Sequence, residues 1–123
     1  MEGIIETRFL RPLDTPNFAD MALVAEQYAA SVLSRYVGEA REELGNVLGE
    51  LCQDLRTTAT VARRAPDRLL KDVNFTFRAF EELIPYLNDY GVKDTKPLED
   101  IRDKLAAWLR QQGRGEEPQS PPR

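Results

Sequence analysis

The chain has 123 residues, a formal net charge of −4, one cysteine and no histidine. This length suits a single domain, and the lone Cys52 excludes an internal disulfide and a four-cysteine zinc site. The missing histidine excludes histidine-based catalytic triads, acid–base relays and histidine-ligated zinc or haem. The acidic balance argues against nucleic-acid binding over the whole surface.

Residues 1–16 are predicted to form an extended apolar arm. Apolar side chains are frequent here, but Pro12 and Pro16 prevent a long regular element. Because so many apolar groups are unfavourable in water, we expect the arm to lie over the rest of the chain or on a neighbouring subunit. Phe9 and Leu10 are its candidate partner-binding residues.

Two segments with helical periodicity follow, at residues 17–37 and 39–64. Asn17 is a good N-cap for the first segment, and Arg63 and Arg64 suit the C-terminus of the second. Gly38 separates them, but one glycine costs a helix only about 1 kcal/mol. The sequence therefore leaves open whether they form two helices or one long, bent helix. The predicted apolar positions are Met21, Val24, Tyr28, Val32 and Tyr36, then Leu44, Val47, Leu48, Leu51, Leu55, Ala59 and Ala62.

A central helix is predicted at residues 66–90, ending at Gly91. Its apolar residues recur at steps of three and four, the spacing of one helical stripe. They are Leu70, Val73, Phe77, Phe80, Ile84 and Leu87. Phe75, Tyr86 and Tyr90 lie beside this stripe, where aromatic side chains suit either a wider core or a binding surface.

The last helix is predicted at residues 96–112, with Pro97 in its first turn and Gly113 at its end. Residues 114–123 are rich in proline, glycine and charge, and are predicted to be a disordered tail. The predicted fold is thus all-α, a bundle of three to four helices forming one domain at residues 17–113. No apolar run reaches the ~18–20 residues that cross a bilayer, so we expect no membrane insertion and a cytoplasmic location.

An acidic helix face is the strongest candidate for chemistry. Glu43, Asn46, Glu50 and Asp54 follow one another at steps of three and four and share one side of a helix. Carboxylates so placed can hold Mg²⁺, a hard cation that prefers oxygen ligands. A solvated polar face is the alternative interpretation, and we assign no cofactor.

The string ELGNVL, from Glu43 to Leu48, resembles the second metal-binding helix of the MazG-type nucleotide pyrophosphohydrolases. The resemblance implies a small, oligomeric, all-α enzyme that hydrolyses nucleoside triphosphates with Mg²⁺, with Glu42, Glu43 and Glu50 as metal ligands. The chain departs from that family at Asn46, where the family has aspartate. It also lacks the three clustered glutamates of the family's earlier helix.

Two further groups are candidates for binding. Gly45 and Gly49 lie one turn apart, a spacing that lets a second helix approach closely. Arg63, Arg64 and Arg68, together with Arg56 and Lys71 and with Arg78 further on, form a basic cluster that suits phosphates or an acidic partner. Helix ends also carry such charges for stability alone.

Three functions remain open from the sequence. The favoured one is a non-enzymatic helical subunit that binds another protein, beginning with a second copy of itself. Its candidate surface comprises Phe9, Leu10, Tyr86, Tyr90, Gly45 and Gly49. The alternatives are the Mg²⁺-dependent nucleotide hydrolase and an accessory subunit of a nucleoprotein complex that uses the arginine cluster.

Overall fold

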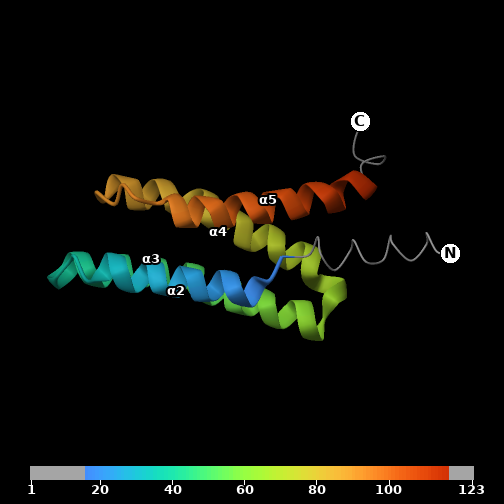
Figure 1. Ribbon diagram of the computed structural model, residues 1–123, viewed down its shortest axis with the longest axis horizontal. Helices are drawn as coiled ribbons and strands as arrows, with labels where there is room; N and C mark the ends of the chain where they lie inside the picture. The colour runs from blue at the N-terminus through green and yellow to red at the C-terminus, as the bar shows by residue number, and fades with distance from the viewer. Residues whose placement is uncertain (1–15, 117–123) are drawn as a thin grey trace.

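The computed structural model describes residues 16–116, which contain helices and no strand. The elements are α2 (Phe18–Leu33), α3 (Gly38–Arg64), the 3₁₀ turn η1 (Pro66–Arg68), α4 (Leu69–Asp89) and α5 (Lys96–Glu116). Figure 1 shows α2 lying along α3 and α4 along α5, and the two hairpins pack together mainly through α3 and α4. The predicted all-α bundle is confirmed. No helix in the 16–116 range is long and apolar enough to cross a membrane.

The chain reverses between α2 and α3, so the alternative of one long helix is wrong. Val37 is extended, with φ −138° and ψ 166°, and Gly38 has a left-handed φ of +65°. The first helix therefore ends at Leu33, four residues before the predicted end. This hairpin buries the apolar faces of both helices against each other, whereas a continuous helix would leave much of them in water.

The inward face of α2 differs from the predicted one. The helix begins as predicted, with the Asn17 Oδ1 accepting a hydrogen bond from the Asp20 N–H at 3.0 Å. Val24, expected in the core, is 44% exposed, and Ala22 is buried instead. Alanines on this side let α2 pack closely on α3, and that close contact sets which residues point inward.

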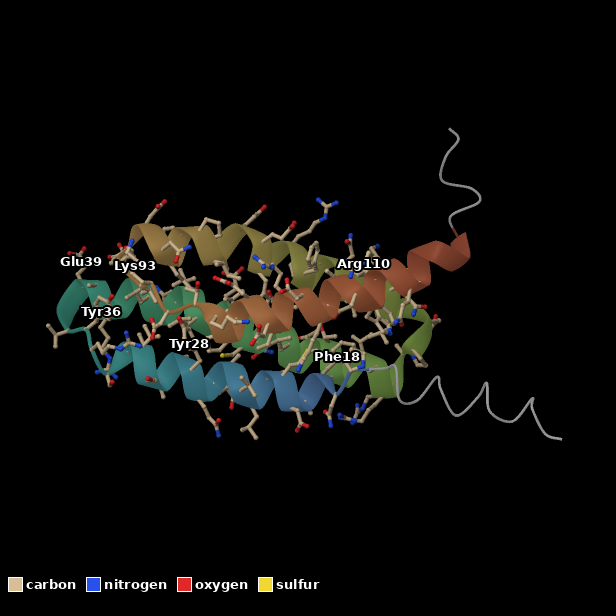
Figure 2. All side chains as sticks on the ribbon, turned by 45° about the horizontal axis from the view of Figure 1, so that its top comes forward. Phe18, Tyr28, Tyr36, Glu39, Lys93 and Arg110 are labelled. Atoms are coloured by element: carbon tan, nitrogen blue, oxygen red, sulfur yellow. The ribbon has the colours of Figure 1, made fainter. Side chains whose placement is uncertain are left out.

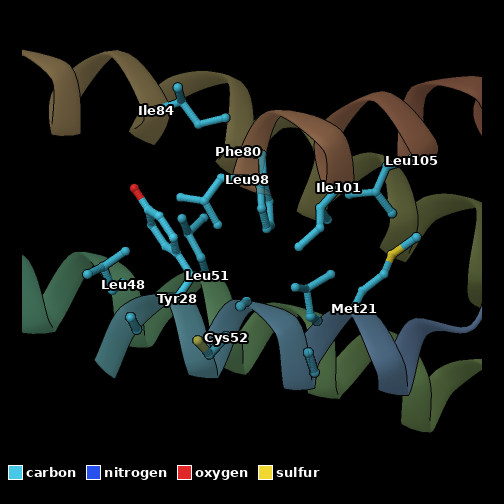
Figure 3. Packing of buried hydrophobic residues seen from close by; sticks show 14 of the residues in the cluster. Met21, Tyr28, Leu48, Leu51, Cys52, Phe80, Ile84, Leu98, Ile101 and Leu105 are labelled. Carbon is cyan, nitrogen blue, oxygen red and sulfur yellow. The ribbon is translucent and has the colours of Figure 1, made fainter. Parts of the chain in front are cut away.

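The predicted stripe of α4 is displaced at its start. Residues 66–68 form a 3₁₀ turn, so α4 begins at Leu69, which is buried, while Leu70 is exposed. Thr76 is buried and Phe77 only half-buried. From Phe80 onward the prediction is confirmed, and Phe80 itself lies in the core among residues of the other helices (Figure 3).

The end of α4 is the glycine cap that the sequence predicted. Gly91 has a φ of +104°, a value that residues with a Cβ rarely adopt. The Val92 N–H donates to the Leu87 carbonyl at 2.9 Å, and the Gly91 N–H to that of Asn88 at 3.0 Å. These two bonds, with Val92 and Leu87 both buried, form a Schellman motif that turns the chain toward α5.

The last helix begins as predicted but ends later. The Thr95 carbonyl accepts the N–H groups of Leu98 and Glu99, both at 3.0 Å. α5 continues through Gly113 to Glu116, a few residues beyond the predicted end at about residue 112. Residues 117–123 lie outside the described range. Trp108 of α5 meets Phe18 of α2 edge-to-face, with ring centroids 6.3 Å apart. Figure 2 labels Phe18 near the start of α2.

Candidate interaction surface

The three glutamates proposed as metal ligands are not gathered into one site. Glu42, Glu43 and Glu50 are all exposed on α3. Across residues 16–116, no group of three or more acidic, cysteine or histidine side chains is placed to hold a metal ion. Glu43 instead accepts hydrogen bonds from Tyr86 of α4 and from Tyr90, the C-cap residue of that helix, so the structure does not assemble the ligand set that the resemblance implied.

Tyr86 and Tyr90 lie where α4 passes the N-terminal part of α3. The Tyr90 hydroxyl donates to the Glu43 Oε1 at 2.9 Å and that of Tyr86 to the same atom at 3.5 Å, while the two rings are 5.9 Å apart. The hydrogen bond to Glu43, with partial burial, raises the pKa of Tyr90 to about 12. Tyr90 therefore serves an internal contact, whereas Tyr86 remains 39% exposed.

The glycine pair is not a site of close helix packing within the described chain. A Cβ added at Gly45 would meet only the Leu33 side chain, at 3.9 Å, and one added at Gly49 would meet nothing within 4 Å. The predicted arm residues Phe9 and Leu10 lie outside the described residues.

We expect Gly49→Ala to stabilise the protein. Gly49 lies inside α3 with ordinary helical geometry and open space around it. Alanine loses less backbone entropy in a helix, so the free energy of unfolding should rise by about 0.5–1 kcal/mol. Urea denaturation measures this change, and a loss of stability would show that another chain packs against Gly49.

Two arginines of the predicted cluster, Arg63 and Arg68, line different grooves. Arg63, Arg64 and Arg68 are exposed and form no ion pair with another residue of the described range. Arg63 lines grooves beside α2, whereas Arg68 lines a groove between α3 and α4. Arg63 and Arg68 therefore line different grooves, and the patch for phosphates or an acidic partner stays a prediction.

A polar cluster that the sequence did not indicate joins α3 to α4. The Thr58 Oγ1 lies 2.5 Å from the Asp72 Oδ2, 2.9 Å from the Thr76 Oγ1 and 2.9 Å from the Asp54 carbonyl. Thr58 and Thr76 are fully buried. Since Thr58 has one hydroxyl hydrogen, it donates to Asp72 across the shortest distance, and Thr76 donates to Thr58.

Asp54 lies at the edge of this cluster. Its Oδ2 is buried and has no hydrogen-bond partner among residues 16–116. Burial, followed by the negative charges of Glu50 and Asp72, raises the pKa of Asp54 to about 6. The folded protein thus holds this proton more tightly than the unfolded chain does.

Asp54→Asn should therefore stabilise the protein at neutral pH. The stabilisation that protonated Asp54 gives the wild-type protein is fully present below the ordinary pKa of 3.8. It is lost as the pH rises through the raised pKa of about 6. With a discount for partial exposure, the variant should be about 1–2 kcal/mol more stable at pH 7 and equal to wild type near pH 4. Guanidinium denaturation across this pH range measures the difference.

Asp94→Asn is the matched control for that experiment. Arg35 lies 2.9 Å from Asp94 and lowers the pKa of Asp94, so this carboxylate stabilises the fold when it is ionised. The variant should lose stability above the ordinary carboxylate pKa, and its difference from wild type should shrink as pH falls. Parallel pH profiles for the two variants would contradict the assignment.

The side of α4 opposite the core carries aromatic and charged side chains at helical spacing. Buried residues such as Val73, Phe80 and Leu87 mark one side, and the residues half a turn away point outward. Phe75 is 62% exposed there. We call this surface the α4 outer face, and it consists of Lys71, Phe75, Arg78, Glu82, Tyr86 and Asp89, all exposed.

The sequence singled out only part of this surface. Tyr86 was predicted as a binding residue and Phe75 as lying off the stripe. Lys71 and Arg78 were assigned to the basic cluster and not to this face, and Glu82 and Asp89 were not singled out. None of these four forms an ion pair with a residue that the structure describes. Their common helical spacing was the signal that could have identified the face.

Comparison with protein-family models, curated proteins and solved structures returned no match to this sequence.

Proposed function

We propose that this chain is a helical protein–protein interaction subunit that works by binding and not by catalysis. The α4 outer face is the surface through which it binds. The observation that carries the proposal is the exposure of Phe75, because a phenylalanine 62% open to water gains free energy when a partner covers it.

The surroundings of Phe75 support the same proposal. An aromatic anchor with a rim of charged side chains is the usual composition of a protein-binding surface. Lys71 and Arg78 flank Phe75 and have no intramolecular ion pair within residues 16–116, so both can pair with a partner. Phe75 and Lys71 also line the groove between α3 and α4, which gives a partner side chain a concave seat.

Chemical cross-linking tests the proposal. Lys71 is the one lysine of α4, and Lys104 of α5 lines the groove between α2 and α5 and serves as an internal control. In protein recovered from its native source, an amine-reactive cross-linker should join Lys71 to another protein chain, which can be a second copy. Phe75→Ser should remove this cross-link and leave products at Lys104 unchanged. Products at Lys104 without any at Lys71 would refute the proposal.

A further inference from the structure

The α4 outer face has opposite charges at matching distances from the middle of the helix. Lys71 lies nine residues before Phe80 and Asp89 nine residues after it; Arg78 lies two before and Glu82 two after. All four side chains are exposed and point away from the core. The first half of the face is therefore basic and the second half acidic, with residue 80 at the centre.

The aromatic and apolar residues follow the same arrangement. Phe75 lies five residues before Phe80, Pro85 lies five after it and Tyr86 six after. Phe75 and Tyr86 are 62% and 39% exposed, and Pro85 is exposed inside the helix. Phe75 and Tyr86 lie on the same flank of the face. When the helix is reversed end for end about residue 80, Phe75 therefore comes opposite Tyr86.

We infer that the partner of this face is a second copy of the same chain. The two α4 helices pack antiparallel, with a two-fold axis at the level of residue 80. Lys71 and Arg78 of each copy then face Asp89 and Glu82 of the other, and Phe75 packs on Tyr86. Every contact occurs twice, as a two-fold interface requires.

Charge decides the orientation of the pair. A parallel arrangement in the same register would place Lys71 against Lys71 and Glu82 against Glu82, and like charges in contact repel. The antiparallel arrangement replaces each repulsion with an attraction. Burial of the aromatic side chains provides most of the affinity, because each exposed ion pair contributes little. The ion pairs instead select the register of the two helices.

The size of the face limits the strength of the dimer. From Lys71 to Asp89 the helix extends about 27 Å, and a single helix face buries less than the ~800 Å² per partner of a standard interface. We therefore expect a reversible dimer with a dissociation constant of roughly 1–100 µM. Because the four ion pairs are exposed, higher salt should weaken it.

Sedimentation velocity of the full chain and three variants tests the inference. Arg78→Glu places two acidic groups together at both symmetry-related contacts, and Glu82→Arg places two basic groups together. Each should weaken the dimer about tenfold. An equimolar mixture of the two variants should dimerise at least as well as wild type, because each mixed contact joins opposite charges. Lys104→Glu, which makes the same change of charge as Arg78→Glu on the groove between α2 and α5, should leave the dimer unchanged.

Two results would overturn the inference. One is a wild-type chain that stays monomeric at about 100 µM, the weak end of the expected range. The other is a mixture of Arg78→Glu and Glu82→Arg that dimerises no better than either variant alone while both keep wild-type helicity by circular dichroism. The inference rests on the proposed function, but the two can fail separately. If the chain is monomeric and Lys71 cross-links to a different protein, the inferred homodimer is refuted and the proposed binding face is retained. If the chain is monomeric and Lys71 forms no cross-link, both the homodimer and the binding face are refuted.

Discussion

Phe80→Ala should reduce the free energy of unfolding by about 3–5 kcal/mol. Phe80 is fully buried and lies at the centre of the packed helices (Figure 3), so its loss leaves a cavity that rigid neighbours cannot fill. For a domain of this size, the midpoint of thermal unfolding should fall by roughly 15–30 °C. Thermal unfolding followed by circular dichroism measures the shift.

Phe75→Ala is the matched control, because it removes the same side chain five residues earlier on the same helix. Phe75 is 62% exposed, so the stability of the monomer should change by no more than about 0.5 kcal/mol. The comparison should be made at low protein concentration, since dimer formation would add stability to the wild type. Equal losses in the two variants would show that α4 is turned differently about its axis.

Thr58→Val should reduce stability by about 1.5–3 kcal/mol. Valine keeps the shape of threonine but removes the hydroxyl that joins Asp72 to Thr76 at 2.5 and 2.9 Å. Thr76 is then buried without its partner, and Asp72 loses a hydrogen-bond donor. Urea denaturation at pH 7 measures the loss.

Two substitutions on the same helix complete that experiment. Thr60→Val changes an exposed threonine of α3 and should alter stability by less than about 0.5 kcal/mol. Thr58→Ser restores the hydroxyl without the methyl group and should recover most of the loss. If Thr58→Ser is as unstable as Thr58→Val, packing of the methyl group and not the hydrogen-bonded cluster stabilises this position.

Local patterns determined the helices of this protein. Leu48, Leu51 and Leu55 on α3, and Phe80, Ile84 and Leu87 on α4, were predicted and are buried, because a helix places residues three and four apart on one side whatever surrounds it. The cap at Gly91 was also predictable, since it depends only on the backbone of adjacent residues.

The candidate sites were less predictable because they combine residues that are distant in the chain. Glu43 and Tyr90 are 47 residues apart, and Thr58 and Thr76 are 18 apart. Glu43 has the sequence context of a metal ligand, yet its position opposite α4 makes it an acceptor for tyrosine hydroxyls. The exposure of Phe75 likewise depends on which sides of α4 are covered by α3 and α5.

By itself, the sequence determined that the chain is helical and approximately where most of its helices lie. It also identified most of the residues that form the core. Only the tertiary structure decided that the chain reverses before Gly38, that Leu69 and Thr76 turn inward, and that Phe75 and Tyr86 stay exposed on the outer face of α4. The physical reason is that helix formation depends on residues within one or two turns. The side of a helix that meets water, in contrast, depends on how the other helices pack against it.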